Sequence, residues 1–323
     1  MQKLALDLPA GYYLERDPDV LVLRRVDGSV AGAFSARGAA PDAVRQLIEE
    51  TEEEGFSAYL PHLPTREEPS LRVFFFGQFE MLCDGNAMRL GRNGKAMTIL
   101  KYLLADRSRP VSQDHLMGWL WPESNLKKAR WSLNSAIHVL RKLLDGCSPS
   151  PATGYVTLED GYYHLSPAIR VWTDVEEFNA CCEKGRRLEK QGSVQEAVLE
   201  YEKAVELYRG DYLIEDLYED WTMVERERLS NAYMDMLGKL AAHHMETGQY
   251  RESIRGCYKV LEKELCHEGS YRLLMHCYAR LGLRGRALEQ YRICEKILEH
   301  KYGTMPSSET RAVYASILNH RSV

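Results

Sequence analysis

Residues 125–144, NLKKARWSLNSAIHVLRKLL, are the stretch that decides how this chain is interpreted. Apolar residues recur there every three or four positions, which is the spacing of an amphipathic helix. On a helical wheel centred on Leu133, the apolar side chains fall within about 60° of the centre and form a continuous stripe. The stripe consists of Ala129, Leu133, Ala136, Ile137, Leu140 and Leu144. The sequence therefore predicts a helix with one buried face.

The rest of this helix is basic and polar, although the whole chain has a net charge of −5. Lysine and arginine neutralise DNA phosphates and release counterions. Asn, Ser and His reach base edges, and a tryptophan contacts a thymine methyl or packs on a sugar. An ordinary solvated face, with Trp131 packed on a neighbouring domain, is the alternative interpretation. The residues concerned are Lys127, Lys128, Arg130, Trp131, Asn134, Ser135, His138, Arg141 and Lys142.

Charge is distributed unevenly along the chain. Residues 71–171 contain 13 basic and 8 acidic residues and have a net charge of +5, whereas residues 1–70 have −6 and residues 172–323 have −4. A basic segment between two acidic ones indicates that the middle segment meets a polyanion.

The length of 323 residues predicts two or three domains. In the first segment, strand-like runs at 19–26 and 29–35 join at Asp27-Gly28, a two-residue hairpin turn. A helix is expected at 41–54, and the polar, proline-containing stretch 63–70 is expected to be a linker.

The middle segment is predicted to run from sheet to helices to hairpin. Strands are expected at 71–82 and 87–90, and helices at 95–107, 113–121 and 125–144. Ser112 is expected to cap the second helix, and Pro122 to stop it. A second hairpin at 155–165 turns on Asp160-Gly161.

The last segment is helical and repetitive. GSVQEAVLEYEKAVELY (192–208), GQYRESIRGCYKVLEKE (248–264) and GLRGRALEQYRICEKIL (282–298) align without gaps. The glycines at 248 and 282 are 34 residues apart, which is the tetratricopeptide period. The longer step from 192 to 248 predicts an inserted or lengthened helix around 210–231. Buried contacts between helices are expected at Ala197, Ser253 and Ala287 and at Tyr201, Cys257 and Tyr291.

Several classes of protein are not expected. The sequence has no signal-peptide core and no apolar run long enough to span a bilayer, so a cytoplasmic location is expected. Residues 91–96, GRNGKA, do not complete a phosphate-binding loop. The eight cysteines include no C-x-x-C pair, so we expect reduced, buried thiols and no metal site. No catalytic constellation is found, so we expect neither an enzyme nor a cofactor.

Four stretches of the middle segment resemble the OmpR-type winged helix. They are LRVFFFGQFEML (71–82), WLWPES (119–124), ARWSLNSAIHVLRKLL (129–144) and YVTLEDGYYHL (155–165). The stretch that begins TDVEEFNACCEKGRRLEKQG (173–192) resembles the bacterial transcriptional activator domain. Both modules in this order are similar to the SARP-type (Streptomyces antibiotic regulatory protein) activators, over about residues 71–320.

The residues and the resemblance together predict an α+β, mostly α fold in three parts. Residues 1–68 lie outside the resemblance, and their expected hairpin and helix predict a small mixed α/β module of unknown role, which either pairs with a second copy or covers the winged helix. Residues 69–170 would be the winged-helix DNA-binding domain, and residues 171–323 the tetratricopeptide-like activator domain.

The resemblance also implies the site residues and partners. Residues 125–144 would be the recognition helix for double-stranded DNA, with Arg130 and Arg141 as phosphate clamps. The tyrosine-rich hairpin would be the wing, which touches DNA through Tyr162 and His164. Tyr155 and Tyr163 of the same hairpin would also lie near the DNA. Such proteins bind direct repeats near promoters as paired protomers and recruit RNA polymerase. The loop shown to polymerase would consist of Trp121, Pro122, Glu123, Ser124 and Asn125.

Two other functions are compatible with the sequence. A tetratricopeptide-type scaffold would bind peptides, with the middle segment as a passive domain. A regulator that responds to a small-molecule effector would use the repeats or the N-terminal module as its sensor.

Overall fold

The computed structural model describes residues 71–88, 94–144, 155–166 and 169–319, together with three strands nearer the N-terminus. The chain divides into two compact units, residues 1–67 and residues 68–323. In the first unit, β1 (Tyr12–Arg16), β2 (Val20–Arg25) and β3 (Val30–Ser35) form an antiparallel sheet in the order β1-β2-β3.

The hairpin predicted from residues 19–26 and 29–35 is confirmed as β2 and β3. Strand β1 has no counterpart among the predicted strands. Its sequence, YYLER, lacks the alternation of apolar and polar residues that marks a half-buried strand, and its pairing with β2 supplies the ladder instead. The turn predicted at 27–28, the helix at 41–54 and the linker at 63–70 lie outside the described residues.

The second unit starts with a four-stranded sheet in the order β10-β4-β5-β6. Its strands are β4 (Leu71–Phe74), β5 (Glu80–Cys83), β6 (Asn86–Ala87) and β10 (Val171–Thr173). In β4, Leu71 and Val73 are buried and Arg72 is exposed, as expected when one face of a sheet covers a core. Strand β10 was not predicted because three residues are too few to show a period. It pairs in parallel with β4.

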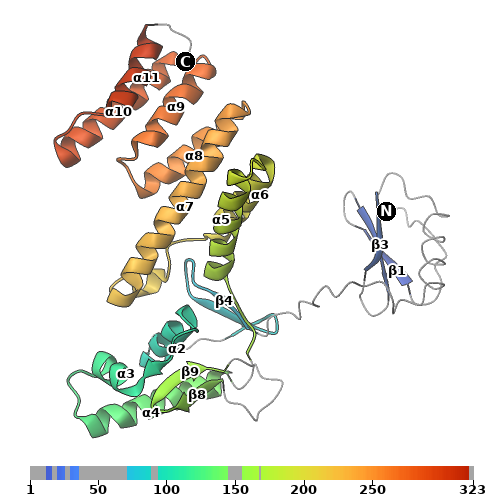
Figure 1. The fold of residues 1–323 in the computed structure, drawn as a ribbon, viewed down its shortest axis with the longest axis vertical. Coiled ribbons are helices and arrows are strands. Elements are labelled where there is room, and N and C mark those ends of the chain that lie inside the picture. Colours follow the sequence, from blue (N-terminus) through green and yellow to red (C-terminus); the bar gives the residue numbers. More distant parts are fainter. Residues whose placement is uncertain are drawn as a thin grey trace. The chain divides into compact units, whose positions relative to one another are not determined.

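Three helices follow: α2 (Lys95–Ala105), α3 (Gln113–Leu120) and α4 (Leu126–Leu144) (Figure 1). As predicted, Ser112 caps α3, because its hydroxyl accepts a hydrogen bond from the His115 N–H at 3.1 Å. A second sheet has the order β7-β9-β8, built from β7 (Val111–Ser112), β8 (Val156–Glu159) and β9 (Tyr162–Leu165). Asp160 and Gly161 both have positive φ, 49° and 83°, which a tight hairpin turn requires.

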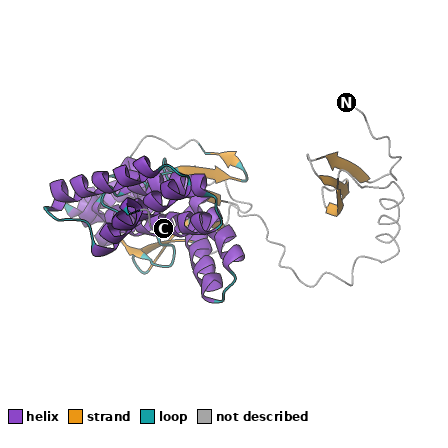
Figure 2. Cartoon of the chain, turned by 90° about the horizontal axis from the view of Figure 1, so that it is seen from above, coloured by secondary structure: helices purple, strands orange, loops and turns teal. Residues whose placement is uncertain are grey.

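The remainder is a stack of helix pairs (Figures 1 and 2). Glycines with φ near +80° end the first helix of each pair: Gly192 at 81°, Gly248 at 79° and Gly282 at 74°. This backbone region favours glycine, which explains why each repeat begins with that residue. The helices are α5 (Asp174–Lys190), α6 (Val194–Leu207), α7 (Asp220–Glu246), α8 (Tyr250–Lys263), α9 (Glu268–Arg280), α10 (Arg284–Tyr302) and α11 (Ser308–Leu318).

The repeat packing is confirmed. The long step between the first two glycines arises from the 27-residue helix α7, which follows a short 3-10 turn, η2 (Ile214–Asp216). Each predicted contact residue is buried: Ala197, Tyr201, Ser253, Cys257, Ala287 and Tyr291.

One core runs from the winged helix into the first repeat. The ring centroids of Phe76 and Phe178 lie 5.2 Å apart, and Phe75 stacks on Tyr212 at 5.5 Å. The buried carboxylate of Asp174 accepts hydrogen bonds from the N–H groups of Phe75 at 2.8 Å and Phe76 at 3.0 Å. The boundary predicted at residues 170/171 thus passes through shared packing.

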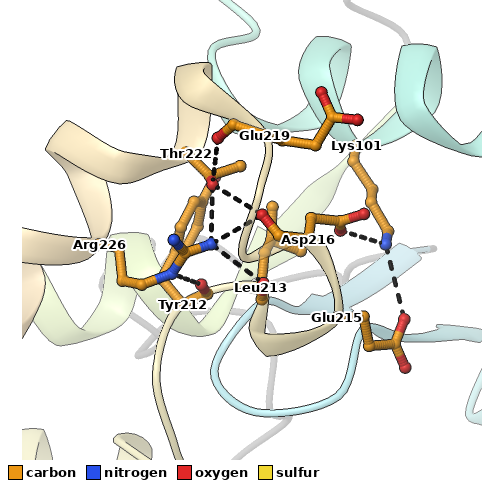
Figure 3. Close-up of polar contacts among 8 residues, drawn as sticks. All are labelled: Lys101, Tyr212, Leu213, Glu215, Asp216, Glu219, Thr222 and Arg226. Atoms are coloured by element: carbon orange, nitrogen blue, oxygen red, sulfur yellow. Dashed lines mark hydrogen bonds and ion pairs between the residues drawn. The ribbon is translucent and has the colours of Figure 1, made fainter.

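A polar cluster reinforces this joint (Figure 3). The buried Lys101 of α2 contacts the carboxylate of Asp216 at 2.5 Å and that of Glu215 at 3.6 Å. Arg226 of α7 donates to the carbonyls of Tyr212 at 2.8 Å and Leu213 at 3.2 Å. Leu213 has a φ of 47°, which is strained for a leucine, and these hydrogen bonds help to hold it.

The thiol prediction holds for part of the chain. Cys181, Cys182, Cys257, Cys277 and Cys294 are free and buried, and Cys266 is free and half-buried. Cys83 is disulfide-bonded, which contradicts the prediction for that residue. Among the described residues, no helix has both the length and the apolar character that crossing a bilayer needs.

Candidate nucleic-acid interface

Helix α4 buries the stripe that the sequence predicts. Its buried residues are Ala129, Leu133, Ala136, Ile137, Leu140 and Leu144. Leu133 and Leu140 are completely buried in the core, which also contains buried residues of α2 and α3. This one-sided packing leaves the opposite side of the helix free for a partner.

Every residue predicted to contact DNA from α4 is exposed. Trp131 is 74% exposed, so the alternative in which it packs on a neighbouring domain does not occur among the described residues. No ion pair of the described residues involves Lys127, Lys128 or Lys142. The exposed set is Lys127, Lys128, Arg130, Trp131, Asn134, Ser135, His138, Arg141 and Lys142.

The first turn of α4 departs from the usual charge preference. It contains no acidic residue, and Lys127 and Lys128 lie there instead. Cations at a helix N-terminus oppose the helix dipole and cost roughly 0.3–1 kcal/mol each. The backbone N–H groups and these two ammonium groups together suit an anion such as a phosphate. The cost to the free protein is therefore offset when a polyanion binds.

The wing is joined directly to the recognition helix. The Arg141 guanidinium donates from Nε to the carbonyl of Val156 in β8 at 3.0 Å. The exposed Tyr162 is at the start of β9, while His164 is half-buried with Nε2 3.5 Å from the Glu159 carboxylate. Arg141 thus fixes the wing against α4, in addition to any contact with phosphate.

Two tyrosines of the hairpin are core residues, which corrects the expectation that they lie near DNA. Tyr155 is 4% exposed and Tyr163 is 2% exposed. Burial raises the pKa of Tyr163, and the nearby charge of Arg141 opposes that rise. In a two-residue-period strand, Tyr163 points opposite to Tyr162 and His164, which explains the difference.

Some residues of the loop between α3 and α4 make structural contacts and are therefore less available to a partner. Asn125 caps α4, because its side-chain oxygen accepts from the Lys128 N–H at 2.9 Å. Trp121 is half-buried, with the Lys95 ammonium 4.8 Å from its ring centroid. Ser124 is half-buried, whereas Pro122 and Glu123 are exposed. Asn125 is exposed as well, but its side chain is used in the cap, so the loop presents Pro122 and Glu123 to a partner.

Sequence reasoning missed Lys95 as a support of this loop. Its ammonium donates to the Leu120 carbonyl at the end of α3, besides covering Trp121. A lysine at the first position of α2 is an unfavourable helix start, and that was the available signal for a tertiary partner.

Comparisons with known proteins agree with this architecture. The family model "Bacterial transcriptional activator domain" matches residues 173–318. Transcriptional regulatory protein MoaR1 of Mycobacterium tuberculosis is 24% identical over 242 residues, covering 75% of this chain and 77% of MoaR1. Transcriptional regulatory protein EmbR of Mycobacterium tuberculosis is 28% identical over 260 residues, covering 79% of this chain and 65% of EmbR. Regulatory protein DnrI of Streptomyces peucetius is 24% identical over 210 residues, covering 65% of this chain and 76% of DnrI.

The fold is also similar to a solved structure. Mycobacterium tuberculosis EmbR, in complex with a low affinity phosphopeptide, superposes with a TM-score of 0.67 and 25% identity, over 79% of this chain and 67% of that chain. The chain spans about two thirds of the length of EmbR. The winged-helix elements, the activator domain and these relatives lead to one conclusion. Residues 173–318 match the bacterial transcriptional activator domain, and the chain is similar to transcriptional regulators over 65–79% of its length, as its resemblance to the SARP-type activators implies.

Proposed function

We propose that this protein is a sequence-specific transcription regulator that binds double-stranded DNA with α4 in the major groove. The observation that carries the proposal is the exposed face of α4, where lysines and polar side chains surround an exposed Trp131. Such a face supplies phosphate contacts through Lys127, Lys128 and Lys142, and base contacts through Asn134, Ser135 and His138. The wing adds Tyr162 and His164 beside the same duplex.

The mode of action follows the relatives. The protein binds direct repeats near promoters as a homodimer on DNA and activates transcription by recruiting RNA polymerase. Pro122 and Glu123, exposed residues of the loop before α4, are the polymerase-facing positions. The relatives are named as regulators rather than enzymes.

The salt dependence of DNA binding tests the site. Each phosphate contact steepens the fall of log K with log salt by about 0.9, so Lys128→Ala and Lys142→Ala should each reduce the affinity and make this dependence shallower. The measurement is a mobility-shift titration at several salt concentrations. Lys296→Ala, an exposed lysine on α10, is the matched control and should change neither quantity. Unchanged slopes for both α4 variants would show that α4 does not face phosphate.

Selection of bound fragments from genomic DNA tests the function class and yields the operator. A regulator enriches a defined sequence that contains a direct repeat. The tetratricopeptide-type scaffold would enrich no sequence, and that outcome would overturn the proposed function.

A further inference from the structure

A cavity of about 650 Å³ lies in the second unit where the winged helix meets the activator domain. One wall comes from the end of α2, from β7 and the start of α3, and from the wing residue Tyr162. The other wall comes from the starts of α5 and α7, including Glu176 and Trp221. This volume is in the range that small-molecule sites occupy.

Aromatic rings form much of the lining. Tyr102 of α2 and Trp221 of α7 meet edge to face with centroids 5.2 Å apart, and His115 of α3 lies 6.4 Å from Tyr102. All three residues line the cavity. Rings that already pack against one another present apolar surface at little cost in side-chain entropy, which favours a flat, aromatic occupant.

The charged lining is predominantly acidic. Asp106, Glu176 and Glu225 line the cavity, with Arg109 as the only cation among the lining residues described. Arg109 lies 3.4 Å from Asp106. The guanidinium groups that pair with the other two carboxylates, Arg107 with Glu176 and Arg228 with Glu225, both at 2.7 Å, are outside the lining. Each of the three carboxylates is thus paired with a guanidinium, but at Glu176 and Glu225 it is the carboxylate and not its partner that lines the cavity.

We propose that this cavity binds an organic cation, namely an amine carried on an aromatic ring system. The ring body would pack among Tyr102, His115 and Trp221, and the ammonium group would lie near Glu176 or Glu225. Aromatic faces attract cations through their quadrupole, and adjacent carboxylates add a direct charge contact. An aromatic acid of the same shape would meet the three carboxylates and be excluded.

An occupant of this cavity touches both halves of the joint. Tyr162 is a wing residue, and Ser112 is the cap of α3, while Trp221 belongs to the activator domain. The ligand therefore favours one arrangement of the wing relative to the activator domain. This regulatory consequence rests on the proposed DNA-binding function. By linkage, the ligand changes DNA affinity by the same factor by which DNA changes ligand affinity.

Calorimetric titration of the full chain with three probes of one shape tests the site itself. The probes are tryptamine, a cation; 3-ethylindole, which is neutral; and indole-3-propionate, an anion. We expect tryptamine to bind at least tenfold more tightly than 3-ethylindole, and indole-3-propionate not to bind. Equal binding of cation and anion, or no tryptamine binding up to millimolar concentration, would overturn the proposal.

Two variants locate the binding. Glu225→Gln should lower tryptamine affinity about fivefold and leave 3-ethylindole binding unchanged, because only a charge is removed. Ala105→Phe, which adds a ring at the exposed end of α2 where Ala105 lines the cavity, should abolish binding of both probes. Glu183→Gln, an exposed carboxylate elsewhere on α5, is the control. Unaltered tryptamine binding in Ala105→Phe would place the probe elsewhere and refute the site.

A final arm repeats the tryptamine titration with the selected operator present. A change in tryptamine affinity when the operator is present supports the regulatory consequence, and an unchanged affinity refutes it. If the chain binds no DNA, the proposed function fails, whereas the calorimetric series still decides whether the cavity is a cation site.

Discussion

Trp131 is a large apolar side chain left 74% exposed on a face that is otherwise mostly charged and polar, with Val139 as a second exposed apolar residue. Covering such a ring is worth roughly 1.5–3 kcal/mol, so a surface that covers it gains affinity. In the major groove, the apolar feature that a base presents is the thymine 5-methyl group. Under the proposed function, Trp131 would read thymine by shape, while its polar neighbours would read hydrogen-bonding groups.

We expect Trp131 and one thymine methyl to be energetically coupled. Replacing that thymine by uracil removes only the methyl group, and the wild-type protein should lose about threefold in affinity, equivalent to one buried methyl. Trp131→Ala should bind more weakly than the wild type but lose nothing further on uracil DNA. The measurement is a double-mutant cycle over each thymine of the selected operator. A uracil penalty of equal size in both proteins would mean that Trp131 packs on a sugar instead.

At the scale of elements, the turn from β10 into α5 connects the two halves of the second unit. Thr173 ends β10 and caps α5, because its hydroxyl accepts from the Glu176 N–H at 3.0 Å. The next residue, Asp174, accepts the N–H groups of Phe75 and Phe76 just beyond β4. One carboxylate thus satisfies two buried donors that no strand partner reaches.

We expect the free energy of unfolding to depend on pH through the carboxyl group of Asp174. Burial raises the pKa of its carboxyl above the ordinary 3.8, although the two N–H groups and Arg209 oppose the rise. The folded state thus holds this proton more tightly than the unfolded state. That contribution to the free energy of unfolding is complete below pH 3.8 and is lost as the pH rises through the folded-state pKa.

The asparagine of Asp174→Asn cannot titrate. We therefore expect the difference in free energy of unfolding between wild type and variant to shrink as the pH rises from 4 to 7. The deficit itself should be about 1–3 kcal/mol, because one buried N–H loses an acceptor. Urea denaturation across this pH range measures both. Asp220→Asn, at the equivalent first position of α7 and exposed, is the control. A deficit independent of pH would contradict the assignment.

The elements that could be predicted from sequence are those with a period or a turn signature. The stripe of α4, the Asp160-Gly161 hairpin and the repeat glycines were all readable, because each depends on local spacing. Strand β10 and the shared core were not, because they depend on contacts between residues about a hundred positions apart. Alternation places Tyr163 opposite Tyr162 and His164 but does not show which face packs inward, and the hold of Arg141 on the wing depends on a tertiary contact with Val156.

At the scale of the whole molecule, DNA-binding and activator segments form one body. The rings of Phe75 and Phe76 on one side and of Tyr212 and Phe178 on the other belong to the same core, and the buried Lys101 adds an ion pair across the joint. Residues 71–170 cut from the chain would expose these surfaces to water. The shared core therefore sets the direction of α4 relative to the stack of repeats.

The strand pairing of β10 with β4 has a consequence for the geometry of promoters. Strand β10 pairs with β4 from Val171↔Leu71 to Thr173↔Val73, and α5 begins at the next residue, Asp174. No flexible linker therefore separates the two halves of a protomer, so one half cannot rotate freely relative to the other. DNA turns once in roughly 10–10.5 base pairs, so inserting about two base pairs between the direct repeats rotates one protomer by about 70°. We expect this insertion to remove cooperative binding of two protomers, measured by footprinting, while affinity for a single repeat stays unchanged. Cooperativity that persists would show that the protomers bend. On this prediction, three residues of backbone pairing would set the helical phase of the operator.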